Sequence, residues 1–202
     1  MFDAKLLPLQ RRLIHPLAGR MHARSVGADS ITLAGFALGL LGILAAAYGL
    51  YWLALAGLVA NRLADGLDGE VARLAGPTDR GAFLDIALDF LFYALFPLGF
   101  AIADPATNAL PAVVLVASFV GTGSSFLAFS IIAERRGLSS EDYPSKGIFY
   151  LGGLTEGAET IGLFVLICLL PEWFPVLALV FAAACFVTTL TRWLAGWRLF
   201  GA

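Results

Sequence analysis

The feature that most limits the fold of this chain is an uncharged run covering residues 30–61. The next break is Gly76-Pro77, and one helix over residues 30–75 would be nearly 70 Å long at about 1.5 Å per residue. A bilayer has a hydrocarbon core only about 30 Å thick. The segment therefore has to cross a membrane twice, with a turn near residues 49–52. Because 59% of the residues are hydrophobic and only 14% are charged, the chain belongs to the membrane class.

Four more apolar segments follow, separated by breaks such as Gly76-Pro77 and Pro171-Glu172. We expect the additional crossings at residues 81–103, 109–133, 147–170 and 175–199. The first crossing is expected to start at Ser30, with Asp29 or Ser30 as its N-cap. The predicted fold class is an all-α membrane protein with six transmembrane helices in a single domain over residues 1–202. Within it, residues 1–28 form an amphipathic interfacial segment and residues 29–202 form the six-helix bundle.

The basic residues are distributed on one side of this predicted topology. With six crossings, all 13 Lys and Arg residues fall in the N-terminal tail or near every second connection, and none lies near residues 50, 104–110 or 171–174. The positive-inside rule then places both termini on the cytoplasmic side, as in a bacterial inner membrane. The net charge is only -2, and we expect membrane lipid but no nucleic acid among the partners.

Residues 1–28 mix leucines with Lys and Arg and contain Pro8 and Pro16. This pattern fits an amphipathic segment on an anionic membrane surface, and it equally fits a basic tail without fixed structure. His15 is expected to be an interfacial side chain. Cys168 and Cys185 lie in apolar runs and are expected to be small buried hydrophobic residues.

Four of the five aspartates between residues 65 and 89 form two closely spaced pairs, in a protein that is otherwise mostly apolar. Asp65 and Asp68 are three residues apart, and Asp85 and Asp89 are four apart, so each pair shares a helix face. A carboxylate at bilayer depth costs roughly 2.5–3.5 kcal/mol. Clustered carboxylates offset such a cost most readily by binding divalent cations. Oxygen ligands alone favour Mg²⁺ or Mn²⁺, and a pair of ions is the usual clamp for displacement at phosphorus.

The residues from 65 to 89 follow the pattern D-x-x-D-G-x-x-A-R, seven residues, then G-x-x-x-D-x-x-x-D. This stretch resembles the signature of the CDP-alcohol phosphotransferase family, integral membrane enzymes of phospholipid synthesis with six helices. The positions that match are Asp65, Asp68, Gly69, Ala72, Arg73, Gly81, Asp85 and Asp89.

The resemblance implies the transfer of a substituted phosphate from a CDP-linked donor, such as CDP-diacylglycerol, to an alcohol acceptor with release of CMP. It implies that two Mg²⁺ or Mn²⁺ ions are held by the four aspartates, and that Asp89 is also the catalytic general base. It further implies a homodimer. The residues expected at the nucleotide are Thr32, Gly69, Ala72, Arg73 and Gly81.

A second polar cluster lies at residues 152–160, where Glu156 and Glu159 are three apart and are therefore expected on one helix face. Acids at this depth usually face a bundle interior or a water-filled cavity. They either line the acceptor pocket or form a structural ion pair with Lys146 or Arg192. Those two basic residues in turn either bind an acceptor phosphate or extend to the membrane interface.

Three other functions compete with this interpretation. The family chemistry also allows transfer of a small phospho-head group from a CDP-amino-alcohol to a lipid alcohol. A small cation or proton transporter would use the acids as a path, but it requires acids spread through the membrane depth. A catalytically dead scaffold would keep the fold, yet all four aspartates are present. The aspartates could also merely form ion pairs with Arg62, Arg73 and Arg80, but pairing alone would not need this glycine and spacing pattern. The phosphatidyl-transfer enzyme explains the glycine and arginine positions best.

Overall fold

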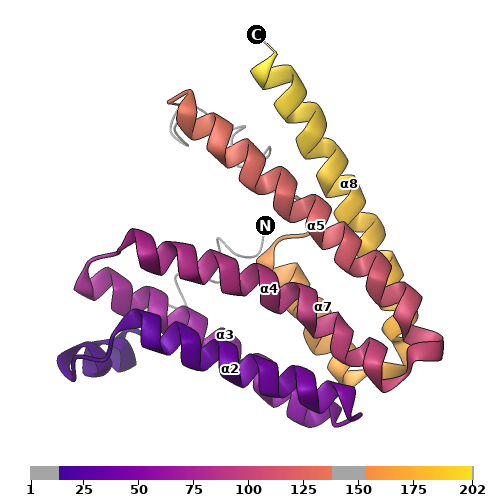
Figure 1. Ribbon diagram of the computed structural model, residues 1–202, viewed down its shortest axis with the longest axis horizontal. Helices are drawn as coiled ribbons and strands as arrows, with labels where there is room; N and C mark the ends of the chain where they lie inside the picture. Colours follow the sequence, from indigo (N-terminus) through magenta and orange to yellow (C-terminus); the bar gives the residue numbers. More distant parts are fainter. Residues whose placement is uncertain (1–13, 138–152, 202) are drawn as a thin grey trace.

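A computed structural model describes residues 14–137 and 153–201, and every regular element within them is a helix (Figure 1). The predicted all-α class is therefore confirmed for the described part of the chain. Residues 14–23 are also helical. The remaining elements are α2 (Ala28–Ala47), α3 (Tyr51–Ala75), α4 (Asp79–Ala103), α5 (Pro105–Arg135), α7 (Gly157–Leu169), the short 3-10 helix η1 (Pro171–Trp173) and α8 (Phe174–Phe200).

Most helix boundaries lie close to the predicted ones, because Gly and Pro interrupt the apolar runs. The turn between α3 and α4 uses Gly76, whose φ of 94° suits a residue without a Cβ. The N-cap expected at Asp29 or Ser30 is wrong. The helix α2 begins at Ala28 with Gly27 as its N-cap and no side-chain cap bond, so Asp29 lies in the first turn. There its charge still favours the positive end of the helix dipole.

The segment predicted to be helical from residue 147 differs most from the structure. Residues 153–156 are not helical, and α7 has only 13 residues, which corresponds to about 20 Å. Four helical stretches in the described residues are long and apolar enough to cross a bilayer: α2, α4, α5 and the continuous run Pro171–Phe200. The helix α3 is excluded by its charged second half, and α7 by its length. The structure thus gives four candidate spans.

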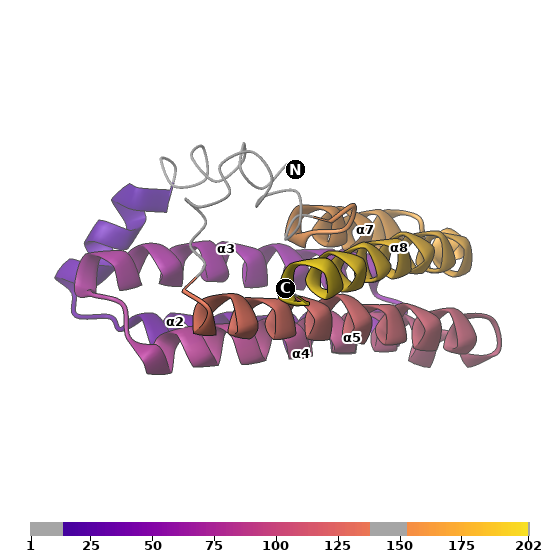
Figure 2. The same cartoon turned by 90° about the horizontal axis from the view of Figure 1, so that it is seen from above.

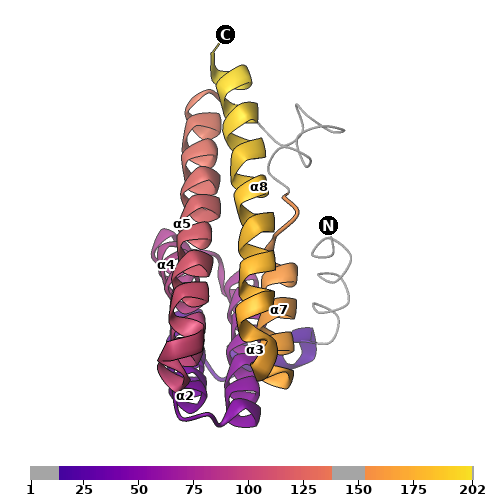
Figure 3. The same ribbon diagram turned by 90° about the vertical axis from the view of Figure 1, so that its right-hand side faces the viewer.

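The helices form two groups that meet at one end of the molecule (Figure 1). In the first group α2 packs against α3 and α4, and in the second α5 packs against α8. The two groups are connected by packing of α4 on α5 and of α3 on α7. Figure 3 shows α5 and α8 running side by side along most of their length. The turns at residues 48–50, 104 and 170–173 lie toward the same end, and the opposite ends of the two groups diverge (Figure 1).

Small residues bring α2 and α3 into close contact. A Cβ on Gly57 would lie 2.5 Å from the Cα of Gly42, a distance that no side chain tolerates. A Cβ on Gly99 of α4 would likewise lie 2.7 Å from the carbonyl oxygen of Ile43. Close backbone approach through small residues is the usual way in which helices associate in membranes.

Aromatic rings fill the core where the two groups meet. Phe96 of α4 stacks on Phe164 of α7 with ring centroids 4.5 Å apart. Phe100 stacks on Phe174 of α8 at 5.1 Å. All four side chains are fully buried. This core fixes the second half of α4. The first half, which carries Asp85 and Asp89, belongs to a helix that packs against α2, and Asp89 contacts Arg62 of α3.

The helix at residues 14–23 lies beside the ends of α2 and α3 that are near the aspartates (Figure 2). Ala18 is fully buried and packs with Ile31 of α2 and Val71 of α3. The described part of the N-terminal segment is therefore docked on the bundle. Its placement on a membrane surface remains a prediction, and residues 1–13 lie outside the described part.

Candidate active site

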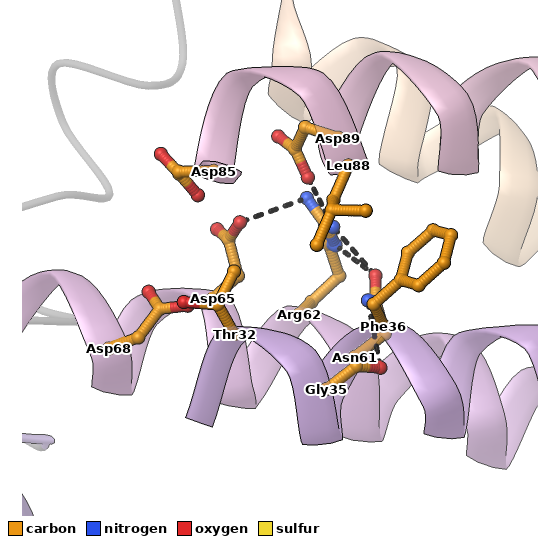
Figure 4. A pocket seen from close by; sticks show the side chains of 10 residues that line it. All are labelled: Thr32, Gly35, Phe36, Asn61, Arg62, Asp65, Asp68, Asp85, Leu88 and Asp89. Atoms are coloured by element: carbon orange, nitrogen blue, oxygen red, sulfur yellow. Dashed lines mark hydrogen bonds and ion pairs between the residues drawn. The ribbon is translucent and has the colours of Figure 1, made fainter. Parts of the chain in front are cut away.

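One pocket lies between α2, α3 and α4 and contains about 240 Å³ of empty space, part of it open to the surroundings (Figure 4). Its walls carry four carboxylates and one guanidinium. The lining residues are Thr32, Gly35, Phe36, Asn61, Arg62, Asp65, Asp68, Asp85, Leu88 and Asp89.

The structure brings all four predicted aspartates to this pocket. Asp65 and Asp68 come from one face of α3, and Asp85 and Asp89 come from one face of α4 (Figure 4). Their spacings of three and four residues are the reason why each pair shares a face. Within the described residues, no three acidic, His or Cys side chains already converge as a preassembled metal cluster. The carboxylates thus line the pocket from two sides.

Asp68 shows that these residues suit a bound cation. Only 5% of this residue is exposed, and its Oδ2 atom is buried without a hydrogen-bond partner. The hydroxyl of Thr32 lies next to the same carboxylate. A buried acceptor without a partner is costly, and a carboxylate oxygen is the ligand that Mg²⁺ and Mn²⁺ prefer. The donor set therefore fits a hard divalent cation.

Arg62 lies between the two pairs of aspartates (Figure 4). Its Nη2 donates to Asp89 Oδ1 at 2.7 Å, and its Nη1 is 3.6 Å from Asp65 Oδ1. Asn61 Oδ1 accepts from Arg62 Nε at 2.9 Å and from Nη2 at 2.6 Å. One guanidinium thus connects α3 to α4 across the pocket.

The sequence interpretation did not include Arg62, Asn61 or Tyr93 among the site residues. Asn61 is buried, and its amide donates to the carbonyl of Gly35 at 3.1 Å. Arg62 Nη1 donates to the Tyr93 hydroxyl at 3.3 Å. One signal was available, because Arg62 precedes Asp65 by three residues and Tyr93 follows Asp89 by four.

Of the five predicted nucleotide residues, only Thr32 lines this pocket. Arg73 is bound by Glu70, which accepts from Arg73 Nε at 2.9 Å. A Cβ on Gly69 would lie 3.6 Å from the Arg73 guanidinium, an ordinary van der Waals contact, so this arrangement does not itself require a glycine. Glu70 also contacts the N-terminal helix, with its Oε1 2.7 Å from His15 Nδ1. Ala72 is half-buried on the same helix.

Gly81 lies in the first turn of α4 and donates its backbone N–H to the capping hydroxyl of Thr78 at 3.1 Å. A Cβ on Gly81 would lie 3.3 Å from Asp29 Oδ1. Asp29 pairs with Arg80 at 2.6 Å, which ties the start of α2 to the start of α4. The aspartates of the pocket are therefore not neutralised by Arg73 or Arg80, whose recorded partners are Glu70 and Asp29.

Of the predicted acceptor residues, Glu156, Glu159 and Arg192 lie elsewhere, and none of these three lines this pocket. Glu156 is the N-cap of α7, and together with Glu159 it forms a capping box in which Glu159 Oε2 accepts from the Glu156 N–H at 3.1 Å. The expectation that both acids share a helix face is thus wrong, because Glu156 precedes the helix. Arg192 is buried and donates to the Thr122 carbonyl at 2.9 Å. Lys146 lies outside the described residues.

The site and fold define a membrane protein with a carboxylate pocket suited to cations, and comparison with known proteins identifies its family. The family model of CDP-alcohol phosphatidyltransferases matches residues 26–190. The chain belongs to this family, which confirms the resemblance drawn from the aspartate pattern. The family consists of phosphotransferases that use CDP-alcohol donors and alcohol acceptors in membranes.

The chain is also similar to the inner membrane protein YnjF of Escherichia coli (strain K12). The two are 48% identical over 192 residues, which cover 95% of this chain and 93% of the relative. Together with the four candidate spans, this similarity shows an integral membrane protein.

Proposed function

We propose that this protein transfers a phosphatidyl group from CDP-diacylglycerol to an alcohol, with release of CMP, in a reaction that depends on Mg²⁺ or Mn²⁺. The observation that carries the proposal is the pocket itself, which four carboxylates and Thr32 line and in which one buried oxygen of Asp68 has no partner. Family membership supports the reaction class. The choice of CDP-diacylglycerol as donor is part of the proposal.

In this scheme Asp65, Asp68, Asp85 and Asp89 would hold two divalent ions. When bound, these ions would neutralise charge on the diphosphate and on the departing CMP. The acceptor oxygen forms a bond to the phosphorus of the phosphatidyl group, and the bond from that phosphorus to the CMP oxygen breaks. Asp89 takes the hydroxyl proton as general base. Arg62 holds the Oδ1 atom of Asp89, which orients this carboxylate across the pocket.

The nucleotide would lie along the aspartate ends of α2, α3 and α4. Thr32 already lines the pocket. Gly69, Ala72 and Gly81 lack long side chains, so they leave the backbone accessible. Arg73 would contact the CDP phosphates, and for this its guanidinium would have to exchange or share its present partner, Glu70.

We also propose that the chain crosses the membrane six times, with both termini and the pocket on the cytoplasmic side. The location of all the basic residues near every second connection supports this topology. The three connections without basic residues lie toward one end of the molecule (Figure 1), as the topology requires. The helices α3 and α7 would be the additional crossings, α7 together with residues that precede it. The proposed assembly is a homodimer, as is common in the family.

The acceptor alcohol is the open part of the proposal. Glu156, Glu159, Arg192 and Lys146 are proposed to influence its choice. The capping box provides a structural role for the two acids, so the acceptor role has to be tested against it. A CDP-amino-alcohol as donor is the second candidate, and it rests on the same reaction chemistry.

The test uses purified protein in liposomes that contain CDP-diacylglycerol and Mg²⁺ or Mn²⁺. Glycerol 3-phosphate, serine, inositol, inositol phosphate and simple amino alcohols are supplied separately, and new phospholipids are detected by mass spectrometry. Asp89→Asn is the matched control. A new lipid with one acceptor, absent in the control, supports the proposal. Product formed only from a CDP-amino-alcohol and diacylglycerol would establish the second candidate instead.

A further inference from the structure

We propose that Arg62 is a resident counter-ion of the aspartate pocket, which holds α3 and α4 together without metal and competes with divalent cations for Asp65 and Asp89. The inference rests on the proposed function, because it assigns a positioning role within the same site. It adds a residue that lies outside the aspartate pattern. Because Arg62 competes for the same carboxylates, it also lowers the affinity of the pocket for divalent cations.

The first observation is the place of the guanidinium. Arg62 Nη2 is 2.7 Å from Asp89 Oδ1, and Nη1 is 3.6 Å from Asp65 Oδ1. These two oxygens belong to different helices and face each other across the pocket (Figure 4). A cation bound between Asp65 and Asp89 would need the oxygens that the guanidinium already contacts.

The second observation is that Arg62 is held in place from several directions. Asn61 accepts two hydrogen bonds from it, and Asn61 is itself fixed by the carbonyl of Gly35. The guanidinium carbon lies 5.2 Å from the centroid of the Phe92 ring and 5.5 Å from that of Tyr93. Only 17% of the Arg62 side chain is exposed. A guanidinium held in this way is not a mobile surface charge.

The third observation is the charge of the pocket. Four carboxylates share the pocket with one guanidinium, and carboxylates near one another repel when they are ionised. Arg62 offsets this repulsion between α3 and α4 because its guanidinium contacts Asp65 on one helix and Asp89 on the other. Without Arg62 the metal-free pocket would lose this contact between its two walls, and a divalent ion would meet no competitor.

The experiment compares the wild type with Arg62→Gln and with Arg80→Gln as the matched control. Arg80 carries the same charge in the first turn of α4 but pairs with Asp29, and 84% of its side chain is exposed. Two quantities are measured in detergent: the thermal unfolding midpoint in EDTA and with Mn²⁺, and the Mn²⁺ dissociation constant from the spin-resonance signal of free Mn²⁺.

We expect Arg62→Gln to unfold several degrees lower than the wild type in EDTA and to recover most of this loss when Mn²⁺ is added. Its Mn²⁺ dissociation constant should fall by on the order of tenfold, because removal of a nearby positive charge favours cation binding. Arg80→Gln should leave both quantities close to wild type. Arg62→Lys keeps the charge without the planar fork of the guanidinium, so its unfolding midpoint and its Mn²⁺ dissociation constant should lie between those of the wild type and Arg62→Gln. This variant replaces Arg62→Gln in the test if Arg62→Gln does not fold.

Equal or weaker Mn²⁺ binding by Arg62→Gln and Arg62→Lys would overturn the inference. If the wild type still released CMP in that case, the proposed function would stand and only the proposed role of Arg62 would be rejected. If the wild type bound no Mn²⁺, both the inference and the proposed metal dependence would be overturned.

Discussion

The protein contains two polar clusters, and they satisfy their polar groups in different ways. The pocket between α2, α3 and α4 gathers four carboxylates around one arginine and leaves Asp68 Oδ2 buried without a partner. The second cluster, called here the hydroxyl cluster, lies between α8 and residues 153–156 and centres on Thr188. Its hydroxyl accepts from the Leu154 N–H and from Thr155, each at 3.1 Å, and donates to the Ala184 carbonyl.

This difference separates a site prepared for a ligand from a polar packing contact. In the hydroxyl cluster, neutral groups bond to each other and to the backbone, which is how polar residues join helices inside a membrane. In the pocket, charges of one sign outnumber their partners, and such an arrangement is expensive unless something binds. Substitutions in the pocket should therefore affect activity first, and substitutions in the hydroxyl cluster should affect stability first.

The largest effect should come from Asp68→Asn. It removes the carboxylate charge but keeps the shape, and we expect CMP release to fall by about 10²–10⁴-fold, the range in which loss of one catalytic group lies. Thermal stability should stay the same or increase, because one of several repelling charges is lost. The test measures the rate of CMP release and the thermal unfolding of the variant in parallel. Near-normal CMP release by Asp68→Asn would show that Asp68 has no role in the active site.

The next largest effect should come from Gly153→Ala in the hydroxyl cluster. A Cβ at this position would lie 2.1 Å from Thr188 Cγ2, so the segment before α7 has to move. We expect a loss of about 1–3 kcal/mol of stability, and CMP release per folded molecule within a few-fold of wild type. Thermal unfolding with activity normalised to folded protein tests this. Normal stability with lost activity would make the hydroxyl cluster a functional site.

A smaller effect is expected from Glu159→Ala, which removes half of the capping box at the start of α7. Loss of a cap typically costs about 1 kcal/mol. The comparison predicts this modest loss of stability with unchanged acceptor preference. If the variant instead changed which alcohol is used, Glu159 would belong to the acceptor pocket, and the comparison would have to be redrawn.

The smallest effect should come from Asp29→Asn at the rim of the pocket. Its partner Arg80 is largely exposed, and such pairs contribute at most about 1 kcal/mol. The free energy of unfolding should change little and should lose its small salt dependence. A large loss in the free energy of unfolding, measured by denaturant titration, would show that the Asp29–Arg80 pair contributes as much to stability as the buried contacts of the protein.

Much of the fold was predictable from the sequence, because apolar runs and Gly or Pro breaks act locally. The helices α3, α4 and α8 begin and end within a few residues of the expected positions. The start of α7 was not predictable in this way. Residues 153–156 lie within the expected crossing at 147–170, but the chain packs against Thr188 there and Glu156 caps the helix.

The aspartates of the pocket were predictable because spacing fixes a helix face and a short turn makes neighbouring helices antiparallel. The contact of Arg62 with Asp65 could be expected from their spacing of three residues, but its contact with Asp89 could not, since it depends on where α4 lies relative to α3. The same holds for the contact of His15 with Glu70, which joins residues 55 positions apart. Contacts of this kind arise from tertiary packing, and local pattern carries no information about them.

The most direct test of the central claim is the metal dependence of CMP release by the wild type in CDP-diacylglycerol liposomes with the productive acceptor. The account predicts no release in EDTA, full recovery when Mg²⁺ or Mn²⁺ is added in excess, and no recovery for Asp68→Asn under the same conditions. CMP release by the wild type in EDTA at the metal-supplemented rate would contradict it.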